Sequence, residues 1–76
     1  MDPTCRTSEA LEALAKAGWK ASDHDEKFSL GNTSIRFRND HIVCYDHGHM
    51  THVLIAAEAL ILRLPDMTAI ARRDES

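Results

Sequence analysis

Two short turn sequences constrain this chain most, because the residues around each alternate between apolar and polar. Gly31-Asn32 suits a two-residue hairpin turn, and Asn39-Asp40 suits a second one. The first turn would pair Phe28 with Ile35, and the second would pair Ile35 with Cys44. Both registers place the same apolar set on one face of a three-stranded antiparallel meander: Phe28, Leu30, Ile35, Phe37, Ile42 and Cys44. A slip of one residue in either hairpin would turn this set to the other face, so the agreement of the two turns favours the sheet.

Helical patterns flank this meander in the sequence. Ser8 can cap a first helix over about residues 8–17, and the polar segment 21–27 is expected to form a loop. A second helix is expected to run to about Leu64, ending before Pro65; Thr51 is a candidate cap, and Gly48 or His49 could start the helix instead.

A short third helix is expected over residues 67–73. The predicted fold class is therefore α+β, a two-layer αβββα(α) arrangement in which the three-stranded meander packs on the helices. A single domain is expected to span residues 1–76, with 1–6 and 74–76 disordered.

Length and charge argue against several classes of protein. Nine Lys and Arg against twelve Asp and Glu give a net charge of −3, which disfavours non-specific duplex binding because that affinity comes from neutralising phosphates. The longest apolar run, residues 53–62, is interrupted by Glu58 and is too short to span a bilayer. The first residues do not resemble a signal peptide, and the two cysteines are interpreted as reduced thiols, so a cytoplasmic location is expected.

Three of the five histidines fall close together, and they are the candidate metal ligands. His47, His49 and His52 follow Cys44, and the spacing His-x-His-x-x-His could converge on one zinc ion. The alternative is that they are polar residues in a strand-to-helix turn. Cys44 has histidines nearby in the sequence but faces the core, where a thiol is normally inert, and Cys5 has no base nearby. No Gly-rich phosphate loop is present, so we expect no enzymatic activity and no required cofactor.

Two charged surfaces are candidate partner-binding sites. Arg36, Arg38, His41 and Tyr45 fall on the outer face of the predicted sheet, where they could contact single-stranded nucleic acid or simply shield the face from water. The net charge makes direct nucleic-acid binding the less favoured alternative. The acidic loop with Asp23, Asp25 and Glu26 could meet a basic protein surface, or could serve solubility alone.

The predicted second helix is apolar nearly all round, so part of its surface needs a cover. The first helix could supply that cover, and so could a second copy of the chain. The candidate dimer interface consists of Leu54, Ile55, Glu58, Ile61 and Leu62.

The size, the acidity and the αβββα order together resemble the small inhibitors encoded by phages and mobile elements, including anti-CRISPR proteins. The resemblance covers the whole chain and includes no diagnostic motif. It implies a protein that binds a nucleic-acid-handling host complex such as a CRISPR effector, with Asp23, Asp25 and Glu26 as the residues that would meet basic groups there. A metal-binding or metal-sensing module and a homodimeric regulatory accessory protein remain as alternatives.

Overall fold

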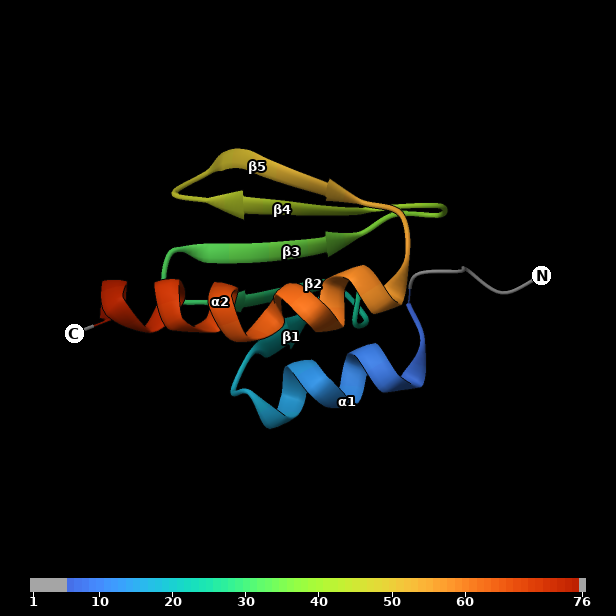
Figure 1. Ribbon diagram of the computed structural model, residues 1–76, viewed down its shortest axis with the longest axis horizontal. Helices are drawn as coiled ribbons and strands as arrows, with labels where there is room; N and C mark the ends of the chain where they lie inside the picture. The colour runs from blue at the N-terminus through green and yellow to red at the C-terminus, as the bar shows by residue number, and fades with distance from the viewer. Residues whose placement is uncertain (1–5, 76) are drawn as a thin grey trace.

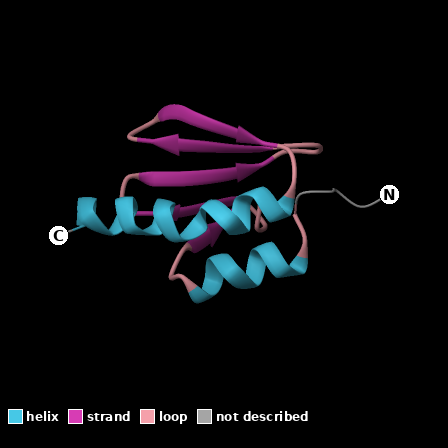
Figure 2. Ribbon diagram, in the orientation of Figure 1, coloured by secondary structure: helices cyan, strands magenta, loops and turns pink. Residues whose placement is uncertain are grey.

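The computed structural model describes residues 6–75, so the expectations for residues 1–5 and 76 lie outside the described part of the chain. The element order is α1 (Ser8–Lys16), β1 (Lys20–Ser22), β2 (Lys27–Leu30), β3 (Thr33–Phe37), β4 (Ile42–Asp46), β5 (His49–Leu54) and α2 (Ala57–Glu75). The strands form one antiparallel meander in the order β1-β2-β3-β4-β5, and both helices lie on one side of it (Figures 1 and 2). The fold is thus α+β with two layers.

The predicted register of the three central strands is confirmed. Phe28 pairs with Ile35, and Ile35 pairs with Cys44. Gly31 takes a φ of 59° at the first central position of its turn, which glycine allows without strain. All the apolar residues expected on the inner face are buried: Phe28, Leu30, Ile35, Phe37, Ile42 and Cys44.

The sheet has five strands rather than three, so the predicted three-stranded meander is wrong in extent. Residues 20–22 form strand β1, although we expected a loop from residue 21. Residues 49–54 form strand β5, although we expected a helix from Thr51. Strand β5 forms because the turn at His47 and Gly48, where both residues have positive φ, reverses the chain after β4. Histidine is enriched in this conformation, and His-Gly therefore closes a hairpin much as Asn-Gly does.

Helix α2 continues through Pro65 to Glu75, whereas we expected one helix to end before Pro65 and a third to follow, with disorder from residue 74. The buried stripe explains the continuity, because it crosses Pro65 without a break: Ala57, Leu60, Leu64, Met67 and Ala71. Pro65 itself is exposed. Packing of this stripe on the sheet compensates for the backbone hydrogen bond that proline cannot make.

The N-cap of helix α1 is Thr7 and not Ser8 as expected. Oγ1 of Thr7 accepts the hydrogen bond from the backbone N–H of Ala10. Side-chain hydrogen bonds then connect α2 to the end of α1 and to Trp19, shortly after it. The indole Nε1 of Trp19 donates to Oγ1 of Thr68 over 3.0 Å. Nη2 of Arg72 donates to the carbonyl of Ala17 over 2.7 Å, so a side chain near the end of α2 hydrogen-bonds the C-cap carbonyl of α1. In the described residues, neither helix has the length and apolar character needed to cross a membrane.

We predict that Pro65→Ala raises the free energy of unfolding by about 1–2 kcal/mol, because alanine restores an N–H inside α2 at an exposed position. Urea denaturation followed by circular dichroism measures the change. A loss of stability would mean that the helix does not continue through this position.

Candidate functional site

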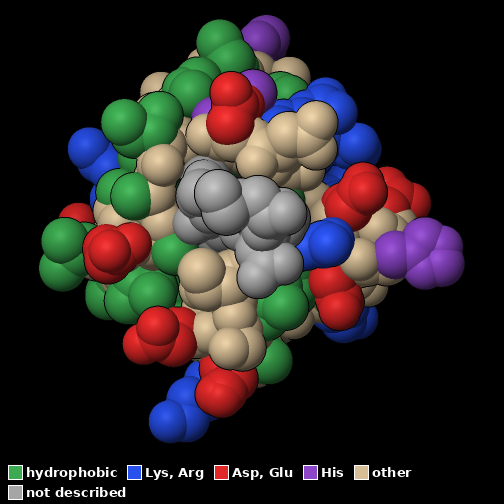
Figure 3. All heavy atoms as spheres, turned by 90° about the vertical axis from the view of Figure 1, so that its right-hand side faces the viewer, with side chains coloured by type: hydrophobic (Ala, Val, Ile, Leu, Met, Phe, Trp, Pro, Cys, Tyr) green, Lys and Arg blue, Asp and Glu red, His purple; other side chains and the backbone are tan. Residues whose placement is uncertain are grey.

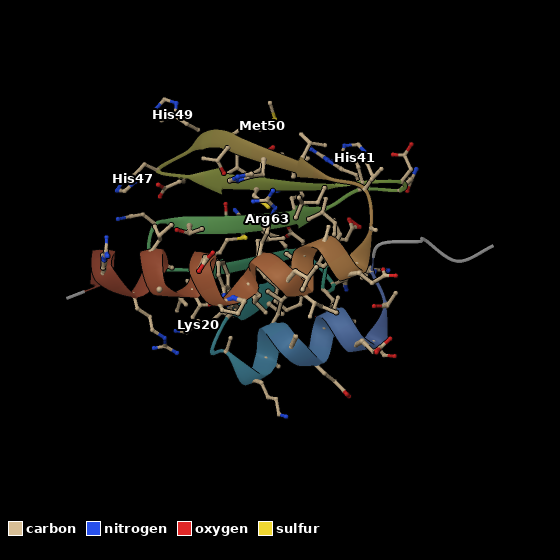
Figure 4. All side chains as sticks on the ribbon, viewed as in Figure 1. Lys20, His41, His47, His49, Met50 and Arg63 are labelled. Atoms are coloured by element: carbon tan, nitrogen blue, oxygen red, sulfur yellow. The ribbon has the colours of Figure 1, made fainter. Side chains whose placement is uncertain are left out.

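The sheet face turned away from the helices, here called the open face, is the broadest candidate surface. The strand register places two rows of side chains across it. The first row is Lys20, Ser29, Ser34, Tyr45 and Met50, and the second is Ser22, Lys27, Arg36, Val43 and Val53. Figure 4 shows the two ends of the first row, with Lys20 beside β1 and Met50 on β5.

The middle of the open face is basic. A shallow hollow of about 380 Å³ is lined by Lys27, Ser34, Arg36, Arg38, Tyr45 and Gly48. Three cationic side chains therefore surround one hydroxyl and one phenol ring. Arginine and tyrosine are enriched in protein interfaces, because each offers both apolar contact area and hydrogen-bond donors.

An acidic turn adjoins this basic centre. Asp23, His24 and Asp25 have φ values of 53°, 56° and 65°, a left-handed conformation that costs non-glycine residues about 1–2 kcal/mol each. Backbone bonds hold the turn in place: Glu26 N–H donates to the Asp23 carbonyl over 3.1 Å, and Phe37 N–H donates to the Glu26 carbonyl over 2.7 Å. The turn is thus built into the sheet and keeps its carboxylates exposed.

Acidic and basic groups meet directly at this end of the open face. Nη2 of Arg36 lies 3.8 Å from Oδ2 of Asp23, and the Asp23 side chain keeps 61% of its surface exposed. A pair this open to water contributes only about 0–1 kcal/mol to stability, so it leaves both groups available for contact. In the end-on view of Figure 3, Lys, Arg, Asp and Glu side chains lie next to one another on the right.

A second hollow, of about 320 Å³, connects the acidic turn with the β3–β4 turn. Its lining comprises Arg6, Glu26, Phe37, Arg38, Asn39, Asp40 and His41. Nδ1 of His41 lies 2.7 Å from Oδ1 of Asp40. The hydrogen bond with His41 and its positive charge hold the pKa of the Asp40 carboxyl below its ordinary value.

Five of the six residues predicted to bind a partner therefore lie toward the end of the sheet that carries the acidic turn, and Tyr45 lies in the other row of the open face, opposite Ser34. Asp23 pairs with Arg36, Glu26 and Arg38 line one hollow, and Arg36, Arg38 and Tyr45 line the other. Asp25 lies in the same turn as Asp23. Sequence reasoning missed Lys20, Met50 and Val53 because strands β1 and β5 were not expected, and it missed Lys27 because residues 21–27 were expected to form a loop. The His47-Gly48 turn is the signal that would have placed β5.

The three candidate metal ligands lie on a hairpin and not in a strand-to-helix turn. His47 is in the β4–β5 turn, and His49 and His52 are on β5. Nδ1 of His47 is 3.0 Å from Asp46 Oδ1, and Nδ1 of His52 is 3.2 Å from Thr51 Oγ1. Among the side chains that the structure describes, no three from His, Cys, Asp or Glu lie close enough together to hold a metal ion. Figure 4 shows His41 at the other end of the strands from His47 and His49.

The five residues of the candidate dimer interface do not form one helical stripe. Leu54 is the last residue of β5 and belongs to the buried core, and Ile55 is in the link to α2. Of the three on α2, Glu58 and Leu62 are exposed. Ile61 is half-buried beside a groove of about 430 Å³ between α1 and α2.

Comparison with known proteins finds no matching family model, no matching curated protein and no matching solved structure.

Cys44 lies on the inner face of β4 and is 1% exposed. Burial raises the pKa of its thiol to about 11 from 9.0, and Arg63 offsets part of that rise. The thiolate is the reactive form, so at neutral pH this group is a poor nucleophile.

We predict that Cys44 reacts slowly with a chromogenic disulfide reagent in the folded protein and rapidly in urea, measured in a Cys5→Ser variant so that one thiol reports. The native rate should keep rising toward pH 11. The unfolded thiol ionises first, so the free energy of unfolding should fall as the pH rises between 9.0 and about 11. A native rate that levels off near pH 9 would contradict the burial of this group.

Proposed function

We propose that this protein is a non-catalytic protein-binding module that contacts its partner through the open face and the adjoining acidic turn. The observation that carries the proposal is the direct meeting of opposite charges on one surface, where Asp23 lies 3.8 Å from Arg36. Basic residues in the centre and carboxylates at the border give this surface a pattern of both signs. Such a pattern selects a partner surface of complementary pattern.

The same pattern favours a protein over a nucleic acid as the partner. A nucleic-acid-binding face needs a field of one sign, because its affinity comes from phosphate neutralisation. Here Asp23, Asp25 and Glu26 lie beside the arginines and would repel phosphates. The open face also offers one aromatic ring, Tyr45, for stacking, and single-strand binders use several.

The partner class follows from the resemblance to phage and mobile-element inhibitors. A host complex that handles nucleic acid carries basic residues where the phosphates bind. The acidic turn, exposed and held by the backbone bonds of Glu26, is suited to occupy such a position. The basic centre around Arg38 would then meet carboxylates at the border of the partner's groove. In this proposal the protein acts in the cytoplasm as an inhibitor of that complex.

The test is capture of partners from nuclease-treated lysate of the native cell by immobilised protein, followed by mass spectrometry. The variants are Arg38→Glu on the open face and Lys16→Glu in the last turn of α1, which change the charge equally at exposed positions. We predict that wild type and Lys16→Glu retain the same protein, and that Arg38→Glu retains at least about tenfold less, equivalent to about 1.4 kcal/mol.

Identification of a nuclease or surveillance complex among the retained proteins would support the inhibitor role, and its activity with and without the protein can then be measured. Equal losses for Arg38→Glu and Lys16→Glu would contradict binding through the open face. Capture is repeated from untreated lysate, and a protein retained there but lost after nuclease treatment would show that binding requires nucleic acid.

A further inference from the structure

The two edges of the sheet differ in how they are protected. Strand β1 has three residues, and helix α1 lies alongside it (Figure 1). Strand β5 has six residues, and among residues 6–75 no element lies beyond it (Figure 1). An edge strand presents N–H and C=O groups that can pair with another strand.

Strand β5 lacks the charged residues and prolines that usually protect an exposed edge, although it contains a β-bulge. Its sequence, HMTHVL, contains no Lys, Arg, Asp, Glu or Pro. Its two side chains on the open face are apolar, with Met50 63% exposed and Val53 52% exposed. On the helix side, Ile70 of α2 is 47% exposed and shares a cavity of about 90 Å³ with Thr51 and His52. Apolar side chains thus lie beside the edge on both faces of the sheet, on the helix side together with the exposed Thr51 and His52.

A β-bulge gives this strand an unusual symmetry. His52 pairs with Cys44 and Met50 pairs with Tyr45, so Thr51 is the extra residue. In a regular strand, residues 50 and 53 would face opposite sides of the sheet. The bulge places both Met50 and Val53 on the open face, while His49 and Leu54 both fall on the helix side.

The facing pattern of β5 is therefore the same when the strand is reversed. If two copies pair antiparallel about a twofold axis between residues 51 and 52, Met50 lies opposite the partner's Val53, on the same face. His49 likewise lies opposite the partner's Leu54 on the helix side. Directly opposed residues of antiparallel strands share a face, and this alignment meets that requirement along the strand.

We propose that β5 is a homodimerisation edge, which pairs with β5 of a second copy of this chain and joins the two sheets into one. The self-matching pattern identifies a second copy as the occupant, because a twofold interface must be complementary to itself. The two Met50–Val53 contacts would lie on the open face, and Ile70 of each copy would cover the helix side. The pairing does not depend on the proposed function, since it uses neither the acidic turn nor Arg38.

Light scattering on a sizing column tests the proposal with the full chain. We expect wild type to have twice the 8.5 kDa mass of one chain. Met50→Lys and Val53→Lys each place a charge on the edge at an exposed position, and we expect each to raise the dissociation constant at least about tenfold and yield monomer. Leu62→Lys is the matched control, because Leu62 is 80% exposed on α2, and it should remain dimeric.

A disulfide experiment tests the alignment itself. In a Cys5→Ser background, Met50→Cys and Val53→Cys variants are purified, mixed and oxidised. We expect a covalent dimer in the mixture and little in either variant alone, because only unlike positions are directly opposed.

A monomeric wild type would overturn the proposal, and so would dissociation by Leu62→Lys together with an intact Val53→Lys dimer. Efficient crosslinking of Met50→Cys with itself would overturn the alignment. Circular dichroism of each lysine variant shows whether the monomer keeps its fold, which excludes unfolding as the cause of dissociation.

Discussion

The register of the meander is the constraint on which the rest of the structure depends. Tight turns fix Phe28 opposite Ile35 and Ile35 opposite Cys44, and side chains of a strand alternate between faces. One alignment therefore decides that Ile35 is buried and that Arg36 lies on the open face. Helix α2 covers the apolar face with an unbroken stripe, and the Trp19–Thr68 hydrogen bond ties the two helical segments together.

The same register determines which side chains lie on the surfaces available for contact. The rows of the open face change character along their length, from Lys20 and Lys27 on the β1 side to Met50 and Val53 on β5. Charged contacts and apolar contacts thus fall at opposite sides of one face. If two copies join through β5, the apolar ends meet at the centre of a continuous sheet, and a charged region with an acidic turn lies toward each outer end. Such a protein would present two equivalent binding surfaces.

The central hairpins were predictable because Gly31-Asn32 is a good turn sequence, and because the weaker Asn39-Asp40 turn places the same apolar residues on one face. Strand β5 was not, because Val53 to Leu62 is apolar at nearly every position and fits a helix as well as a strand. The His47-Gly48 turn decides between them, through the tolerance of histidine for positive φ. Pro65 led to the wrong prediction of a helix end, because burial of Met67 and Ala71 outweighs the unfavourable effect of proline inside a helix. Arg36 and Tyr45 were expected on the outer face of the sheet and lie there, because the register of β3 and β4 was predicted. Lys20 and Met50 on the same face were not expected, because β1 and β5 were not.

Nuclear Overhauser contacts between strands, measured by NMR, test the register most directly. The structure predicts contacts of Arg36 with Lys27 and Val43, and of Val43 with Val53, along one row. Contacts of Arg36 with Phe28 or Cys44 as its directly opposed residues would reveal a one-residue slip and contradict the account. A helical pattern of contacts over residues 49–54 would also contradict it, because β5 and its free edge would not exist.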